Sequence, residues 1–230
     1  TPPPCVGYLY IFYSGAVEGK AGFFGAADNL LATTNLFGVA TTPNNLQPDL
    51  PGGVLPYPQI AQPTLLANDQ FFAHGATGLG DINGDGYADI VLTAPNFSAG
   101  AGNPGQAYVI FGSNALPGVF ALSTLNGSNG FAVASTEVPT LSLGTAAAIG
   151  LVNGDNFSDV VLGAPDAAPG GLPSAGSVFV VYGHSGAFPL QTGLNTLNGS
   201  NGFAIHGAVA GSKAGGSLSF VPDFNGNARP

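Results

Sequence analysis

Residues 81–95 read DINGDGYADIVLTAP, an acidic loop that leads directly into an apolar run. A related stretch, LVNGDNFSDVVLGAP, occupies residues 151–165, at an offset of 70. The loop is crowded with short oxygen-bearing side chains, whereas Val, Ile and Leu dominate the run that follows, which is typical of a β-strand. The sequence is therefore organised around a repeated loop-and-strand unit.

Other anchors keep nearly the same period. LNGSNGF recurs at 125–131 and 197–203, and VIFG at 109–112 corresponds to VVYG at 180–183. No segment shows the period of a long amphipathic helix. A unit of about 70 residues with about four short strands predicts an all-β fold, specifically a β-propeller made of such blades. A β-solenoid would have shorter coils, and a sandwich would not repeat so regularly.

Composition narrows the function classes. Of the 230 residues, 45% are hydrophobic and 7% charged, which is enough apolar material for a sizeable core. The formal net charge of -9 disfavours nucleic acid as a partner and suits a protein that takes up cations. No apolar run approaches the length of a membrane span. The single cysteine, Cys5, excludes an internal disulfide framework.

The repeats predict a domain organisation. LYIFYS at 9–14 aligns with YVIFGS at 108–113, and LANDQFF at 66–72 aligns with LNGSNGF. We therefore expect one partial propeller over 1–230: a strand of a preceding blade at 7–14, an insertion at 15–65, blades at 66–125 and 126–196, and an incomplete blade at 197–230. The insertion is either a binding loop or a surface excursion. Because closed propellers use about 4–8 blades, we expect either a longer polypeptide or a second chain to complete the ring.

The first loop predicts a cation site. Its oxygen donors stand at positions 1, 3, 5, 7 and 9: Asp81, Asn83, Asp85, the carbonyl of Tyr87, and Asp89. Hard oxygen ligands on a flexible loop select Ca²⁺ over zinc or copper, and Mg²⁺ prefers to keep its waters. An EF-hand would need Glu at position 12, where this chain has Leu92. The alternative is an Asx-rich turn without a metal.

Two further loops are weaker versions of the first. The second retains Asn153, Asp155, the carbonyl of Phe157, and Asp159, but Leu151 replaces the first carboxylate, so we expect a weak or empty site. The third offers Asp223, Asn225, Asn227 and the carbonyl of Arg229, and its ninth position would fall after Pro230.

The combined pattern resembles the FG-GAP repeat, which builds the seven-bladed propeller of integrin α subunits and occurs in many bacterial secreted proteins. Gly163-Ala164-Pro165 corresponds to the GAP element, and Thr93-Ala94-Pro95 departs from it by one residue. LNGSNGF resembles the bacterial branch of the family. The resemblance covers about residues 66–230 and the strand at 7–14, and it implies that calcium pins these loops mainly as a structural ion.

No catalytic motif is present. His74, His184 and His206 have no Ser/Asp partner pattern, and nothing in the spacing requires Asp166 and Glu137 to act as a glycosidase pair. We therefore expect no enzyme in this segment. The first hypothesis is a secreted or cell-surface propeller for adhesion, protein–protein interaction or surface assembly. The alternatives are a lectin-like module that holds glycans between Tyr57, Tyr108 and Tyr182, and an accessory domain of a secreted hydrolase.

Overall fold

The structure is a computed structural model that describes residues 8–10, 59–61, 75–95, 97, 103–117, 119–135 and 140–221. The chain divides into two units, the first comprising residues 1–67 and 114–124 and the second residues 68–113 and 125–230. We call them unit 1 and unit 2.

Unit 1 contains a three-stranded sheet in the order β1–β2–β6. Its strands are β1 (Tyr8–Tyr10), β2 (Gln59–Ala61) and β6 (Val119–Ala121), and the 3-10 turn η1 (Leu122–Thr124) follows. The first two strands run antiparallel, and β6 adds parallel to β2. Since β2 lies within residues 15–65, the last part of the segment expected as an insertion contributes a strand to a sheet.

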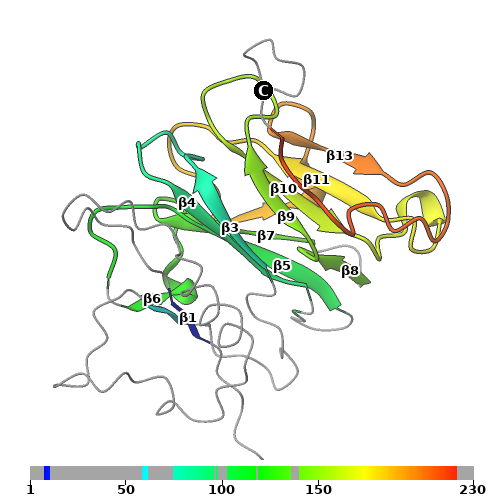
Figure 1. The fold of residues 1–230 in the computed structure, drawn as a ribbon, viewed down its shortest axis with the longest axis horizontal. Coiled ribbons are helices and arrows are strands. Elements are labelled where there is room, and N and C mark those ends of the chain that lie inside the picture. Colours follow the sequence, from blue (N-terminus) through cyan, green and yellow to red (C-terminus); the bar gives the residue numbers. More distant parts are fainter. Residues whose placement is uncertain are drawn as a thin grey trace, which may run out of the picture. The chain divides into compact units, whose positions relative to one another are not determined.

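Unit 2 contains two sheets of the same design (Figure 1). The first sheet consists of β3 (Gly75–Gly80), β4 (Asp89–Ala94), β5 (Asn103–Ile110) and β7 (Gly130–Ala134). The second consists of β9 (Ala147–Gly150), β10 (Asp159–Ala164), β11 (Ser177–Val181) and β13 (Gly202–His206). Neighbouring strands within each set of four are antiparallel and follow the order of the chain. The four-strand unit expected from the repeat is thus present twice.

Two short strands extend the first sheet. β12 (Gln191–Gly193) pairs parallel with β7, and β8 (Thr140–Leu143) pairs parallel with β5. The helices of unit 2 within the described ranges are the 3-10 turns η2 (Pro169–Gly171) and η3 (Leu194–Thr196). The all-β prediction is therefore confirmed.

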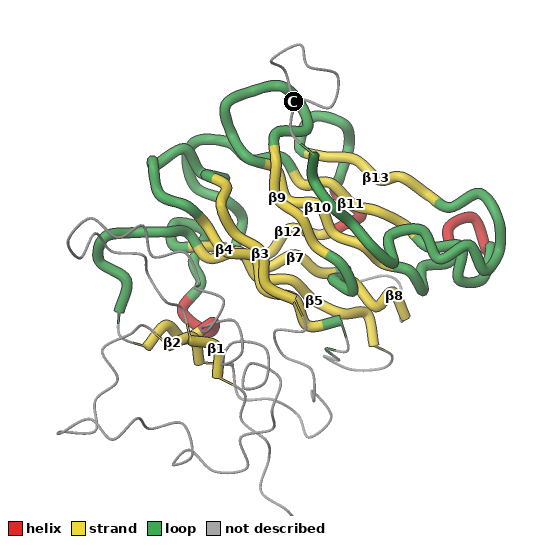
Figure 2. The backbone as a smooth tube through the Cα atoms, viewed as in Figure 1, coloured by secondary structure: helices red, strands yellow, loops and turns green. Residues whose placement is uncertain are grey.

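Both sheets of unit 2, which lie side by side in Figure 2, contribute to one hydrophobic core. The first sheet contributes Val91, Val109 and Phe131, and the second contributes Val160 and Leu162, all of them without measurable exposure. Because both faces of the central strands are covered, β4 and β10 are apolar almost throughout instead of alternating. Each such side chain contributes about 1.5–3 kcal/mol on burial.

The strand bounds also show where each structural repeat begins and ends. The four antiparallel strands of the first sheet run from residue 75 to residue 134 and those of the second from 147 to 206, so LNGSNGF leads into the fourth strand in both. The limits expected from the sequence, 66–125 and 126–196, divide the chain after the first residue of this turn in one case and directly before it in the other. LANDQFF, the segment aligned with the turn near the N-terminus, lies outside the described residues.

Candidate metal site

The acidic loop at 81–88 joins β3 to the antiparallel strand β4. Strands therefore flank it on both sides, unlike the helices of an EF-hand. The carboxylate of Asp81 folds back over the loop and accepts backbone N–H groups from Gly84 at 2.7 Å, Asp85 at 3.1 Å and Gly86 at 2.8 Å. This one side chain therefore accepts three N–H groups of the tight turn, of which that of Asp85 is shared with Asn83 Oδ1.

The side chains at positions 3 and 5 bind each other. The Asn83 amide nitrogen donates to Asp85 Oδ2 at 2.9 Å, and the Asp85 N–H donates to Asn83 Oδ1 at 3.1 Å. Asp85 Oδ1 also accepts the N–H of Tyr87 at 2.9 Å. Successive Asx turns of this kind are the turn chemistry that Asn and Asp supply.

Asp89, the ninth residue, lies beneath the loop and is fully buried. Its Oδ2 accepts the N–H of Ile82 at 2.6 Å, and its Oδ1 accepts the N–H of Gly112 at 2.8 Å. Gly112 follows β5, and Ile82 follows β3. The Asp89 carboxylate, on the intervening strand β4, therefore joins the start of the loop to the end of β5. The aromatic-Gly element at 111–112 thereby acquires a structural role.

Burial raises the pKa of Asp89 to about 6. Its hydrogen bonds from Gly112 and Ile82 act in the opposite direction, while the nearby charges of Asp85 and Asp81 raise the pKa further. The loop therefore concentrates negative charge around a carboxylate that has lost its water. A cation placed here would offset both the desolvation of the Asp89 carboxylate and its repulsion by Asp81 and Asp85.

The donor set suits calcium in kind. Each of the three carboxylates keeps at least one acceptor position beyond the hydrogen bonds described above, because an ionised carboxylate offers about four. In the part of the chain that the structure describes, however, no three Asp, Glu, His or Cys side chains converge on one point. To bind an ion, Asp81 and Asp85 would exchange some of their present hydrogen bonds for metal contacts.

The second loop repeats this geometry with one loss. Asp159 is fully buried, accepts the N–H of Val152 at 2.6 Å and of Asn153 at 3.2 Å, and accepts the N–H of Gly183 at 3.0 Å. Burial raises its pKa as well. Leu151 stands where Asp81 stands in the first loop, so no carboxylate at that position collects the N–H groups of the turn.

The Asn153–Asp155 pair also matches its counterpart. The Asn153 amide donates to Asp155 Oδ2 at 2.7 Å, and Asp155 Oδ1 accepts the N–H of Phe157 at 2.7 Å. The turn can therefore form without a carboxylate at position 1. What the first loop gains from Asp81 at position 1, where the second loop has Leu151, is a further negative charge.

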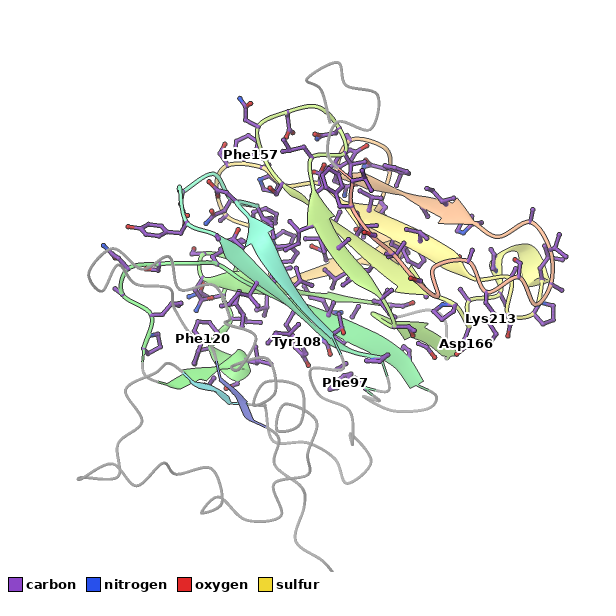
Figure 3. The ribbon with its side chains drawn as sticks, viewed as in Figure 1. Phe97, Tyr108, Phe120, Phe157, Asp166 and Lys213 are labelled. Carbon is purple, nitrogen blue, oxygen red and sulfur yellow. The ribbon has the colours of Figure 1, made fainter. Side chains whose placement is uncertain are left out.

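The two loops lie against each other. The N–H of Ser158 donates to the carbonyl of Asp81 at 2.8 Å, and the N–H of His184 donates to the carbonyl of Ile82 at 3.0 Å. A β-carbon at Gly84 would lie 2.4 Å from the ring of Phe157. Figure 3 shows Phe157 beside the loops, far from Asp166 and Lys213 at the other end of the second sheet.

The predicted ligands of the first loop lie on one turn and those of the second on another, but in neither described turn do three Asp, Glu, His or Cys side chains converge on one point. Asp223, Asn225, Asn227 and Arg229 lie outside the described residues. Sequence reasoning missed the N–H groups of Gly112 and Gly183 as partners of the buried aspartates. The signal was present, since both glycines end strands whose sequences recur at an offset of 71.

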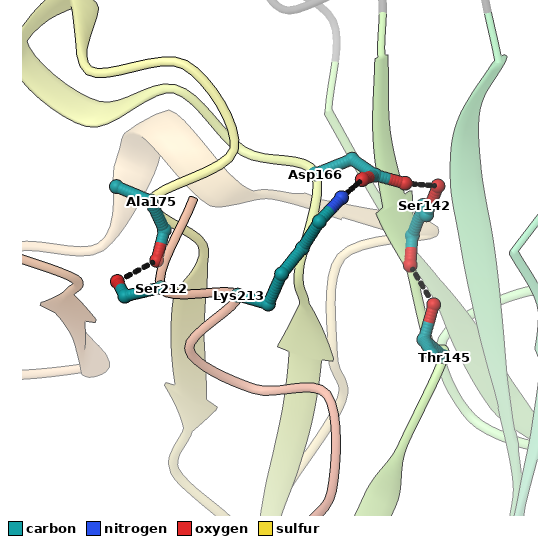
Figure 4. A network of polar contacts seen from close by, with 6 residues as sticks. All are labelled: Ser142, Thr145, Asp166, Ala175, Ser212 and Lys213. Atoms are coloured by element: carbon teal, nitrogen blue, oxygen red, sulfur yellow. Dashed lines mark hydrogen bonds and ion pairs between the residues drawn. The ribbon is translucent and has the colours of Figure 1, made fainter. Parts of the chain in front are cut away.

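The opposite end of the second sheet carries a polar network (Figure 4). Lys213 donates to Asp166, and the Ser142 hydroxyl donates to the second oxygen of Asp166 at 2.6 Å. The hydrogen bond from Lys213, followed by that from Ser142, lowers the pKa of Asp166. Glu137, its possible partner in a glycosidase pair, lies outside the described residues.

The histidines and tyrosines are dispersed. His206 Nδ1 lies 2.9 Å from Ser177 Oγ, a pairing that the sequence did not indicate, but Ser177 is 1% exposed and out of reach of a substrate. His184 stacks on Phe188, and His74 and Tyr57 lie outside the described residues. Tyr108 lies in β5 of the first sheet, whereas Tyr182 directly follows β11 of the second. None of the described helices is long and apolar enough to cross a membrane.

These features define an all-β architecture in the described part of the chain, in which unit 2 repeats a four-stranded antiparallel set with an acidic loop before its second strand. The family model of the FG-GAP repeat matches residues 75–110, which hold β3, the first loop, β4 and β5. The resemblance noted in the sequence is thus confirmed over residues 75–110, which match the FG-GAP repeat.

Curated proteins with related sequences share one description, phosphatidylinositol-glycan-specific phospholipase D. The Rattus norvegicus protein is 33% identical over 104 residues and the Mus musculus protein 35% over 106 residues, in each case 45% of this chain and 12% of the relative. The Bos taurus protein is 25% identical over 171 residues, 71% of this chain and 20% of the relative. The chain therefore spans between 12% and 20% of the length of these relatives.

Proposed function

We propose that this chain is part of an extracellular, non-catalytic β-propeller that calcium stabilises and that serves adhesion, protein–protein interaction or surface assembly. The two four-stranded sheets would be two blades of a larger, seven-bladed ring. The observation that carries the proposal is Asp89, a fully buried carboxylate whose pKa is raised to about 6 beside two more carboxylates.

The ion would be held by the first loop. Its ligands would be the side chains of Asp81, Asn83, Asp85 and Asp89 with the carbonyl of Tyr87, which supply only hard oxygen donors. The ion would add positive charge where the chain has concentrated negative charge. The chain's own part is to hold the loop between β3 and β4 and to fasten it, through Asp89, to Gly112. The second loop, without a carboxylate at position 151, would bind more weakly.

Calcium titration of the metal-stripped protein tests this proposal. We expect the melting temperature to rise by several degrees with Ca²⁺ and to fall again with EGTA, because binding to the folded state alone stabilises it. Asp85→Asn should weaken the calcium dependence strongly. The equivalent change in the second loop, Asp155→Asn, is the matched control and should leave the high-affinity response unchanged. A melting temperature that is indifferent to calcium and EGTA would refute the calcium site.

A second candidate is an accessory domain of a hydrolase. The partial similarity to phosphatidylinositol-glycan-specific phospholipase D favours it, since this chain matches only a small share of each of those proteins. The sequence of the complete gene product separates the two candidates. An attached catalytic domain would favour the accessory role, and further repeats alone would favour the adhesion or assembly role. The ligand in either case would be a protein or a glycan.

A further inference from the structure

The second repeat of unit 2 extends a segment onto the first sheet. Residues 186–193, which we call the arm, follow β11 and end in β12 on the outer edge of β7. Two backbone hydrogen bonds fix the arm: the N–H of Phe188 donates to the carbonyl of Gly127, and the N–H of Ala132 donates to the carbonyl of Leu190, both at 3.0 Å. The arm thus adds a strand to the first sheet, whereas β9, β10, β11 and β13 of the same repeat form the second sheet.

An aromatic side chain anchors the arm. The Phe188 ring stacks on that of Phe131 with centroids 4.5 Å apart and planes 3° apart, and its centroid lies 5.3 Å from that of Phe111. Phe188 is only 6% exposed. The backbone also comes close, since a β-carbon on Gly127 would lie 2.0 Å from the carbonyl oxygen of Phe188. The site that receives the arm, called here the acceptor site, therefore consists of the Phe111–Phe131 pair, Gly127 and the outer edge of β7.

The same pairing occurs in unit 1. There β6 adds parallel to the outer edge of β2, which itself pairs antiparallel with β1. β6 and β12 lie at equivalent places in their repeats, 72 residues apart, so both arms of the described chain add a parallel strand to an earlier sheet. A parallel strand added to the edge of an earlier sheet thus occurs twice among the described residues.

The second sheet of unit 2 presents the same acceptor site. The rings of Tyr182 and Phe203 have centroids 6.0 Å apart and planes at 58°, and the equivalent pair, Phe111 and Phe131, has 6.0 Å and 56°. Gly199 occupies the place of Gly127, but a β-carbon there would meet no atom within 4 Å. Where β7 is buried along its whole length, β13 exposes 53% of Ile205. Among the described residues β13 pairs only with β11.

We propose that the outer edge of β13, with Tyr182, Phe203 and Gly199, binds a parallel strand from an arm of the same type, supplied by a further repeat of a longer polypeptide. The arm would place a large apolar side chain on the Tyr182–Phe203 pair and continue into a short extended segment, as 186–193 does on β7. Backbone bonds from the strand edge would give affinity and the aromatic site specificity. This inference goes beyond the calcium proposal and does not depend on it.

A synthetic peptide tests the site in trans. The probe is fluorescein-labelled SGAFPLQTGL, the sequence of residues 185–194, titrated against the full 230-residue chain and followed by fluorescence anisotropy. We expect saturable binding. The same peptide carrying Phe188→Ser should bind at least about tenfold more weakly, because it loses the aromatic anchor. Equal binding of the two peptides, or no saturable binding, would overturn the proposal.

A variant of the chain locates the binding. Ala204 is equivalent to Ala132, whose N–H bonds the arm. Ala204→Pro removes that outward donor, and proline is tolerated on an edge strand when its missing N–H faces outward. Peptide affinity should fall at least about tenfold while the far-UV circular dichroism stays unchanged. If the peptide instead displaced the resident arm from β7, Ala204→Pro would not affect binding, and this result would also overturn the proposal. The comparison of the two peptides on the wild-type chain is independent of how this variant folds.

Discussion

The carboxylate of Asp89 accepts N–H groups from residues 7 and 23 positions away along the chain, and Asp159 repeats the arrangement at 7 and 24. At the scale of single residues, these two aspartates fasten each acidic loop to the end of a strand. Calcium, if bound, would add to a framework that hydrogen bonds already hold. The structural and the ion-binding roles of the loop are therefore separable by experiment.

The first prediction concerns pH. Because the pKa of Asp89 is raised from 3.8 to about 6, and that of Asp159 is raised too, the folded protein holds these protons more tightly than the unfolded chain. The stability they contribute is present below the unfolded pKa and is lost as pH rises through the folded value. In EGTA, we expect the melting temperature to fall by a few degrees between about pH 4 and about pH 6.5.

The control for this prediction is the double variant Asp89→Asn, Asp159→Asn, whose melting temperature should vary less over the same range. Saturating calcium should reverse the slope in the wild type, because the metal binds the deprotonated carboxylates. A wild-type melting temperature that rises with pH in EGTA would contradict the assignment.

At the scale of elements, the two acidic loops contact each other unequally. Gly84 and Gly154 are equivalent and have similar backbone angles, with φ of 75° and 80°. A β-carbon at Gly84 meets the ring of Phe157, whereas one at Gly154 meets no atom within 4 Å. Substitutions at these two glycines therefore distinguish the cost of backbone strain, which both share, from the cost of contact with Phe157, which only Gly84 has.

Alanine at each position gives the second prediction. Gly154→Ala should reduce the free energy of unfolding by about 1 kcal/mol, the strain of a left-handed backbone. Gly84→Ala should cost about 1 kcal/mol more, because the Phe157 ring has to move. Denaturant titration in EGTA measures both. Equal losses would mean that the loops do not press on each other in solution.

Sequence reasoning recovered the elements with strong local signals. DIVLTAP and DVVLGAP became β4 and β10, and the loops before them have the expected turns. It could not find β12, since Gln191-Thr192-Gly193 has no apolar alternation and pairs with a strand nearly one repeat earlier. The hydrogen bond from Gly112 to Asp89 was also missed, because it depends on how strands are ordered in space, although the recurrence of Gly112 and Gly183 after matching strands is visible in the sequence.

At the scale of the whole molecule, the arm makes one sheet depend on the repeat that follows. The third prediction is that Phe188→Ala reduces the free energy of unfolding by about 3 kcal/mol, because a large side chain leaves a packed aromatic site. Leu190→Ala, two residues on and 60% exposed, is the matched control and should change it by less than about 0.5 kcal/mol.

Calorimetry measures both changes, since about 1 kcal/mol shifts the melting temperature by about 2–4 °C in a chain of this size. Separate unfolding transitions for the two sheets of the Phe188→Ala variant would show that the arm couples them. Similar effects of the two substitutions would contradict the anchoring role of Phe188.

The backward direction of the arms has a consequence for biosynthesis. β6 reaches back to β2 and β12 reaches back to β7, so the covering strand always emerges from the ribosome after the edge it covers. Folding during translation should thus trail synthesis by one repeat, and the newest edge should stay exposed to chaperones until the next arm has been made.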